Sequence, residues 1–181
     1  MMPTIRKEIM IVASPDQVWD AVSDIGAVHY RLVPGYTENT LIDGYERILF
    51  LAGGGITREY IVSIDEEERR MAYSVVEGRM PLLNHHASFQ VSPHDDNSTK
   101  LIRITDFLPA HLAPEIQARI NRGAEVMKET IEAEAKRRRS MSIMIVAATR
   151  ESNSRTLTNH LSCYEDENPD LSGFFILIRI I

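Results

Sequence analysis

Apolar and polar residues alternate with a period of two in the first part of the chain, a pattern that predicts β-strands. Three isoleucines that share one face predict a strand over residues 4–13. The next residues, SPDQ at 14–17, form a helical capping box with proline at the first helical position. Two short helices are therefore expected after the first strand, and the second one ends before Pro34-Gly35.

Residues 36–109 continue the period of two in six segments that are separated by short turns. Asp43-Gly44 and the glycines at 53–55 mark two of these turns. The period then changes to 3.6, and one apolar stripe predicts a long helix that extends to the arginines at 137–139. A long antiparallel sheet and one long helix must bury their apolar faces against each other, so the expected fold class is α+β. The stripe consists of Ile116, Ile120, Met127 and Ile131.

The composition is that of a globular protein, since 44% of the residues are hydrophobic and 25% are charged. The 20 basic and 26 acidic residues leave a net charge of −6, which argues against a general nucleic-acid binder. Cys163 is the only cysteine, and the N-terminus lacks the apolar run of a signal peptide. We expect a cytoplasmic protein without membrane insertion, because no apolar run approaches the ~18–20 residues that cross a bilayer.

Three segments carry a resemblance to a known superfamily: IVASPDQVWDAVSD, GGGITREYIVSIDEEERRMAYSVVEG, and STKLIRITDFLP followed by the long helix. Through them, residues 4–138 resemble the START-like (SRPBCC) superfamily and its polyketide cyclase/dehydrase-like members. The resemblance implies a helix-grip fold, in which a bent antiparallel sheet of about seven strands wraps around the long C-terminal helix. It also implies an internal cavity for a small, largely apolar ligand. We expect residues 1–139 to form this ligand-binding domain.

Alternation along the strands assigns the side chains that face this cavity. It turns Tyr60 inward, and it separates the two adjacent histidines, with His85 inward and His86 in solvent. The facing of residues 101–107 stays open, because the resemblance turns Arg103 inward whereas hydrophobicity favours the opposite face. The predicted cavity wall consists of Trp19, Arg58, Tyr60, Tyr73, Val75, Glu77, His85, Phe89, Arg103, Phe107, Ile120 and Met127.

The charged residues of this predicted wall have two interpretations. A buried arginine needs a carboxylate partner, which either Glu77 or the ligand supplies. In the first case Arg58 and Arg103 form ion pairs within the protein, and in the second case they anchor an acidic ligand. Because the chain has no H-x-x-x-H or C-x-x-C spacing, we expect neither a metal nor a cofactor.

These features favour a protein that binds a hydrophobic small molecule, such as a lipid, a polyketide or an aromatic metabolite. One alternative is a cyclase or dehydratase that uses polar cavity residues, and whether the protein is an enzyme stays open. A second alternative is a co-chaperone-like module for protein interaction.

Residues 140–181 are expected to form a C-terminal extension of unknown role. The pattern SMSIMIVAATRESNSRTLTNHL predicts a strand, a polar loop and the start of a helix. It resembles the opening of a flavodoxin-like flavin reductase, but the remaining chain is too short to build that fold. The apolar residues at 174–181 have high β propensity, so a homodimer through a sheet edge is possible.

Overall fold

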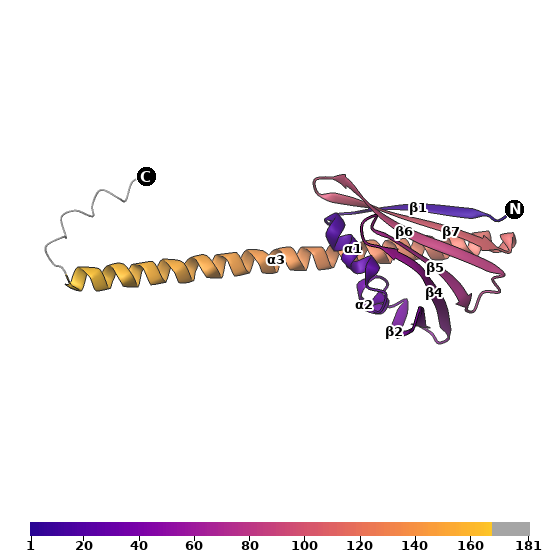
Figure 1. Cartoon of the computed structure of the whole chain (residues 1–181), viewed down its shortest axis with the longest axis horizontal. Helices are drawn as coiled ribbons and strands as arrows, with labels where there is room; N and C mark the ends of the chain where they lie inside the picture. The colour runs from indigo at the N-terminus through magenta and orange to yellow at the C-terminus, as the bar shows by residue number, and fades with distance from the viewer. Residues whose placement is uncertain (168–181) are drawn as a thin grey trace. The chain divides into compact units, whose positions relative to one another are not determined.

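The computed structural model describes the backbone of residues 1–167 and the side chains of residues 1–147 and 149. The chain divides into two compact units, and the first of them, Met1–Lys136, contains the whole sheet. Seven strands wrap around the part of the long helix that belongs to this unit (Figure 1). The predicted α+β helix-grip fold, with two short helices after the first strand, is confirmed.

The elements follow one another in the order that the hydrophobic pattern predicts. They are β1 (Thr4–Ile11), α1 (Pro15–Ser23), α2 (Val28–Arg31), β2 (Thr37–Asp43), β3 (Glu46–Leu51), β4 (Ile56–Asp65), β5 (Arg70–Glu77), β6 (Asn84–Asp95), β7 (Ser98–Leu108), η1 (Ala110–Leu112) and α3 (Ala113–Glu167). The sheet is antiparallel, and its strand order is β1-β7-β6-β5-β4-β3-β2. The first strand therefore pairs with the last one, and Thr4 lies opposite Asp106.

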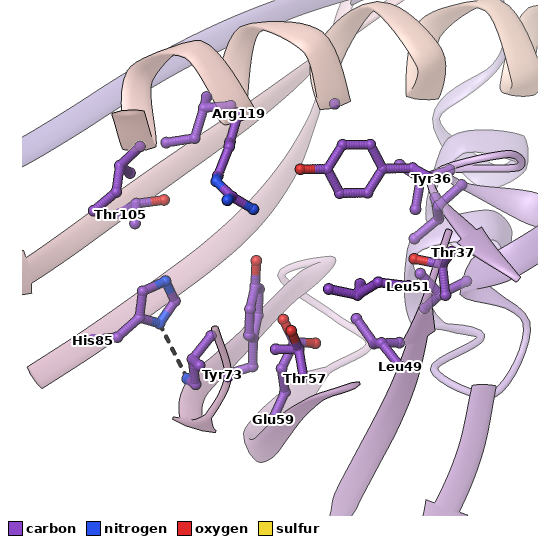
Figure 2. A pocket seen from close by; sticks show the side chains of 18 of the residues that line it. Tyr36, Thr37, Leu49, Leu51, Thr57, Glu59, Tyr73, His85, Thr105 and Arg119 are labelled. Atoms are coloured by element: carbon purple, nitrogen blue, oxygen red, sulfur yellow. Dashed lines mark hydrogen bonds between the residues drawn. The ribbon is translucent and has the colours of Figure 1, made fainter. Parts of the chain in front are cut away.

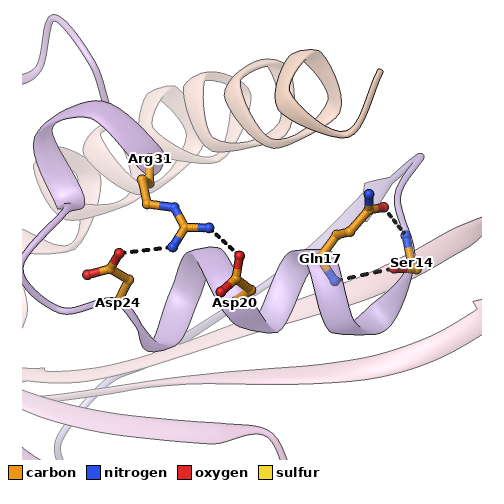
Figure 3. A network of polar contacts seen from close by, with 5 residues as sticks. All are labelled: Ser14, Gln17, Asp20, Asp24 and Arg31. Carbon is orange, nitrogen blue, oxygen red and sulfur yellow. Dashed lines mark hydrogen bonds and ion pairs between the residues drawn. The ribbon is translucent and has the colours of Figure 1, made fainter. Parts of the chain in front are cut away.

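The start of α1 is held by the capping box that the sequence predicts (Figure 3). The backbone N–H of Gln17 donates to Ser14 Oγ at 3.3 Å, and the backbone N–H of Ser14 donates to Gln17 Oε1 at 3.1 Å. Arg31 then joins the two short helices, since its guanidinium forms ion pairs with Asp20 and with Asp24. Against the sheet, α1 contacts β6 and β7, and α2 contacts β2.

The apolar stripe of α3 packs against the sheet in two clusters. Near the start of the helix, Ile116 and Ile120 pack with Phe107 of β7 and with Leu112. Further along, α3 joins a larger cluster that also contains residues of α1, α2 and most of the strands. The α3 residues in this larger cluster are Ala124, Met127, Ile131 and Ala135.

The prediction of a strand and a loop after residue 140 was wrong. The structure continues α3 as one helix to Glu167, and the sequence contains no glycine or proline between Gly123 and Pro169 that would end it. The residues at 174–181, which were predicted to pair with a sheet edge, lie outside the described residues. Among the helices that the structure describes, none is both long enough and apolar enough to cross a lipid bilayer.

The capping box generates a prediction about stability. Replacing Ser14 by alanine removes the acceptor for the Gln17 N–H, and we expect the free energy of unfolding to fall by about 1 kcal/mol. Urea denaturation followed by circular dichroism measures this change. Ser63→Ala, at an exposed position of β4, is the control, and we expect it to change stability by less than about 0.5 kcal/mol. Equal effects of the two substitutions would contradict the role of the cap.

Candidate functional site

A cavity of about 180 Å3 lies between the sheet and α3, within the first compact unit. Strands β3 to β7 form one side, and Tyr36 and Thr37 contribute from the start of β2. Helix α3 forms the other side, where Ile120 and Met127 are apolar and Gly123 presents no side chain. Figure 2 shows polar side chains of the strands facing those of the helix across this space.

The first polar group of the wall is a buried ion pair between neighbouring strands. Arg47 of β3 and Glu59 of β4 are register partners, and their side chains are only 4% and 8% exposed. Arg47 Nε donates to Glu59 Oε2 at 2.5 Å, and the guanidinium lies 4.9 Å from the centre of the Tyr73 ring. Burial of two charges is tolerated because each neutralises the other.

The second polar group joins β5 to β7. Arg103 Nη2 donates to the hydroxyl oxygen of Tyr73 at 3.0 Å, and the same guanidinium lies 5.5 Å from the centre of the Phe89 ring. Burial raises the pKa of the Tyr73 hydroxyl, although the nearby Arg103 acts in the opposite direction. The hydroxyl therefore stays protonated at neutral pH and keeps a proton of its own to donate.

The third polar group is His85, whose side chain is held in one tautomer. The residue is 7% exposed, and the backbone N–H of Val75 donates to His85 Nδ1 at 3.1 Å (Figure 2). Burial, followed by the positive charge of Arg103, lowers the pKa of His85 to about 4. The imidazole is therefore neutral at pH 7, and because Nδ1 accepts a hydrogen bond, the ring proton lies on Nε2.

Several polar atoms of the wall have no hydrogen-bond partner among the described residues. In the part of the chain that the structure describes, Arg47 Nη1, Arg103 Nε and Thr105 Oγ1 are buried without a hydrogen bond, and all three residues line the cavity. Buried polar groups in native proteins are normally hydrogen-bonded, so this concentration of unpartnered atoms at one place is informative.

The structure brings together seven of the predicted wall residues. They line the cavity and are Tyr73, Val75, His85, Phe89, Arg103, Ile120 and Met127. On β7 the structure resolves the open alternative, because Leu101, Thr105 and Phe107 are fully buried on the same face as Arg103. His85 is turned inward and the adjacent His86 is exposed, as alternation predicts. That these residues contact a ligand stays a prediction.

The predicted facing of β4 was wrong. Tyr60 is 42% exposed, whereas its neighbours Glu59 and Ile61 are buried. Arg58 also lies outside the cavity wall, where it pairs with Glu46 of β3, and its Nε lies 3.8 Å from a carboxylate oxygen of Glu77, which is itself exposed. Arg58, Tyr60 and Glu77 are therefore not cavity residues. The apolar residues on the face of Tyr60 led to the prediction that this face points inward. Nothing local in the sequence shows that Glu59, on the opposite face, is neutralised by a residue of another strand.

Two other predicted wall residues are buried but do not line the cavity. Trp19 packs in the larger core cluster, and its indole N–H donates to the carboxylate of Glu66. Phe107 packs with Leu112 and Ile116 in the smaller cluster at the start of α3. Both residues therefore belong to the core that supports the site.

Arg47, Glu59 and Thr105 line the cavity but are not among the predicted wall residues. The sequence does contain a signal for the ion pair. Arg47 shares a strand face with Leu49, and Glu59 lies on the next strand, after the turn that the three glycines form. Opposite charges at register partners of a hairpin form a cross-strand pair, even on a buried face. Among the described residues, no group of three or more histidine, cysteine or acidic residues could hold a metal ion.

Comparisons with known proteins agree with this architecture. A family model described as polyketide cyclase / dehydrase and lipid transport matches residues 2–140. No curated protein matches the chain. Solved structures do match the chain.

The protein XoxI from Bacillus cereus superposes with a TM-score of 0.63 at 20% identity, over 74% of this chain and 96% of that chain. A START superfamily protein from Mycobacterium smegmatis gives a TM-score of 0.59 at 14% identity, over 74% and 97% of the two chains. Norcoclaurine synthase from Thalictrum flavum, in complex with dopamine and hydroxybenzaldehyde, gives 0.59 at 20% identity, over 74% and 86%. At these identities the likeness shows the fold.

The buried state of His85 generates a prediction about pH. The folded protein lowers the pKa of His85 from 6.5 to about 4, so between these values the unfolded chain binds a proton that the folded protein does not. Stability from this residue is fully present above pH 6.5 and is lost as the pH falls towards 4, by roughly 3 kcal/mol in total.

The variant His85→Asn isolates this effect, because an asparagine oxygen can accept the Val75 N–H but does not titrate. We expect the unfolding free energy of the wild type to fall relative to that of the variant between pH 6.5 and pH 4. Urea denaturation at a series of pH values measures the difference. Parallel stability curves would contradict the buried, neutral state of His85.

Proposed function

The chain belongs to the polyketide cyclase / dehydrase and lipid transport family, and from this membership we propose that it binds a hydrophobic small molecule in the cavity between the sheet and α3. The match to the family model agrees with the START-like resemblance of the sequence. The observation that carries the proposal is the cavity itself. Helix α3 packs against the sheet before and after Gly123, but at Gly123 it leaves this space open.

The apolar part of the wall supports an apolar ligand. Leu49 and Leu51 of β3 face Ile116, Ile120 and Met127 of α3 across the cavity. A ligand that buries its apolar surface here gains about 25 cal/mol for each Å2 removed from water. A lipid, a polyketide or an aromatic metabolite has this character, and the likeness to a synthase that holds dopamine and hydroxybenzaldehyde is consistent with an aromatic ligand.

The polar part of the wall favours binding over acid–base catalysis. A cyclase or dehydratase needs a group that accepts a proton from its substrate. The Glu59 carboxylate is held by Arg47, and His85 Nδ1 accepts the Val75 N–H, so both of these acceptors are engaged. The low pKa of His85 also makes its imidazole a weak base. We therefore place the enzyme second to the binding protein.

Gly123 allows a direct test of where the ligand binds. A Cβ atom at Gly123 has one neighbour outside its own helix turn, Arg103 Nη1 at 4.0 Å, so alanine fits and leucine extends into the cavity. N-phenyl-1-naphthylamine, an uncharged apolar probe, becomes fluorescent when it leaves water. We expect Gly123→Ala to bind it like the wild type and Gly123→Leu to bind it at least tenfold more weakly.

Both substitutions raise the helix propensity of α3, and thermal unfolding of both variants shows whether each remains folded. Equal binding by the wild type and Gly123→Leu would place the probe outside the cavity and contradict the proposal. Native mass spectrometry of the protein purified from cells then identifies the ligand class. A copurified apolar molecule that Gly123→Leu does not retain is the expected result.

A further inference from the structure

The unpartnered atoms of the cavity point to the chemistry of the ligand's polar end. We propose that the ligand is an apolar acid, whose anionic group binds to Arg103 and Thr105 on β7. This inference rests on the proposed binding function and adds the ligand class.

The guanidinium of Arg103 is only partly satisfied by the residues that the structure describes. Its Nη2 is used by Tyr73, but its Nε is buried without a hydrogen bond. Within the described residues, no carboxylate forms an ion pair with this guanidinium. Because a buried guanidinium N–H without an acceptor is costly, and the charge of this arginine has no counter-charge, an anion from outside the protein would stabilise it.

The rest of the wall does not supply this missing charge. The Glu59 carboxylate is already paired with Arg47, so it does not compensate the charge of Arg103 as well. His85 is neutral, Arg119 is already paired with Glu115 of its own helix, and Arg79 is exposed to solvent, so the uncompensated charge of the wall is that of Arg103. The cavity therefore carries excess positive charge, although the whole chain has a net charge of −6.

The available hydrogen-bonding groups are donors as well. Tyr73 accepts from Arg103, so its own hydroxyl proton is free to point elsewhere. His85 carries its ring proton on Nε2, and Arg47 Nη1 is a donor without an acceptor. The buried Thr105 hydroxyl can donate too, and it lies on the same face of β7 as Arg103. A carboxylate accepts several hydrogen bonds at once, and bonds from a guanidinium to it are charge-assisted.

An ordered water molecule is the competing occupant, since water also accepts hydrogen bonds from buried donors. The two explanations differ in one measurable respect. Water as the resident partner makes the cavity indifferent to the charge of an apolar ligand, whereas an anion site makes it selective.

Two fluorescent probes separate these explanations, because they share one apolar body. N-phenyl-1-naphthylamine is uncharged, and 8-anilinonaphthalene-1-sulfonate carries an added sulfonate. We expect the wild type to bind the sulfonate probe at least tenfold more tightly than the uncharged one. We expect Arg103→Met to abolish this preference, so that the ratio of the two Kd values falls from tenfold or more to about one.

Two further variants complete the test. Thr105→Val keeps the shape of the side chain and removes an unpartnered hydroxyl, so it folds, and we expect it to weaken sulfonate binding by threefold or more. Arg58→Met is the control, because Arg58 lies outside the cavity wall and pairs with Glu46, and we expect the preference to stay intact.

Equal Kd values for the two probes in the wild type would overturn the acid-binding proposal while leaving the binding function in place. An unchanged preference in both Arg103→Met and Thr105→Val would overturn it as well. If the proposed binding function itself is wrong, the outcome is different: the uncharged probe does not bind, or Gly123→Leu does not weaken its binding.

Discussion

One helix has to fill the concave side of a seven-stranded sheet, and the rest of the structure depends on how it does so. A single α3 cannot cover the whole face, because a helix with its side chains is only about 10–12 Å across. It packs tightly near Ile116 and again from Ala124 to Ala135, and the cavity lies beside the helix surface where these two contacts meet. The same packing that stabilises the domain therefore keeps a space open inside it.

Tyr73 is the centre of the polar wall. Arg47 lies against the face of its ring, Arg103 donates to its hydroxyl oxygen, and the rings of His85 and Phe89 lie about 6 Å from its own ring. Aromatic faces attract guanidinium groups and a hydroxyl oxygen accepts hydrogen bonds from them, so the tyrosine helps to hold the buried Arg47 and the half-buried Arg103 in one wall. An apolar residue at this position would leave both cations with less compensation. The charge of the cavity is thus a property of the arrangement and not of any single side chain.

Much of this fold could be predicted from the sequence, because its signals are local. The capping box at Ser14, the alternation in β6 and the apolar stripe of α3 each report on a few neighbouring residues. The facing of β4 could not be predicted in this way. Tyr60, Val62 and Ile64 of this strand are exposed. The inward Glu59 is stable only because Arg47 lies opposite on β3, which is a non-local condition. The polar atoms of the cavity wall could not be predicted from the sequence either, because only the three-dimensional structure shows which of them have no hydrogen-bond partner.

The pairing of β1 with β7 has a consequence for how the chain acquires its fold. Residues of β1 leave the ribosome before those of the other strands, but Asp106, the partner of Thr4, is synthesised 102 residues after it. During that interval the backbone groups of β1 have no strand to bond with, and α3, which closes the core, follows later still. Such a distant pairing raises the contact order, and domains of high contact order fold slowly. We therefore expect the nascent chain to depend on its completed C-terminal half, and to need protection from aggregation until then.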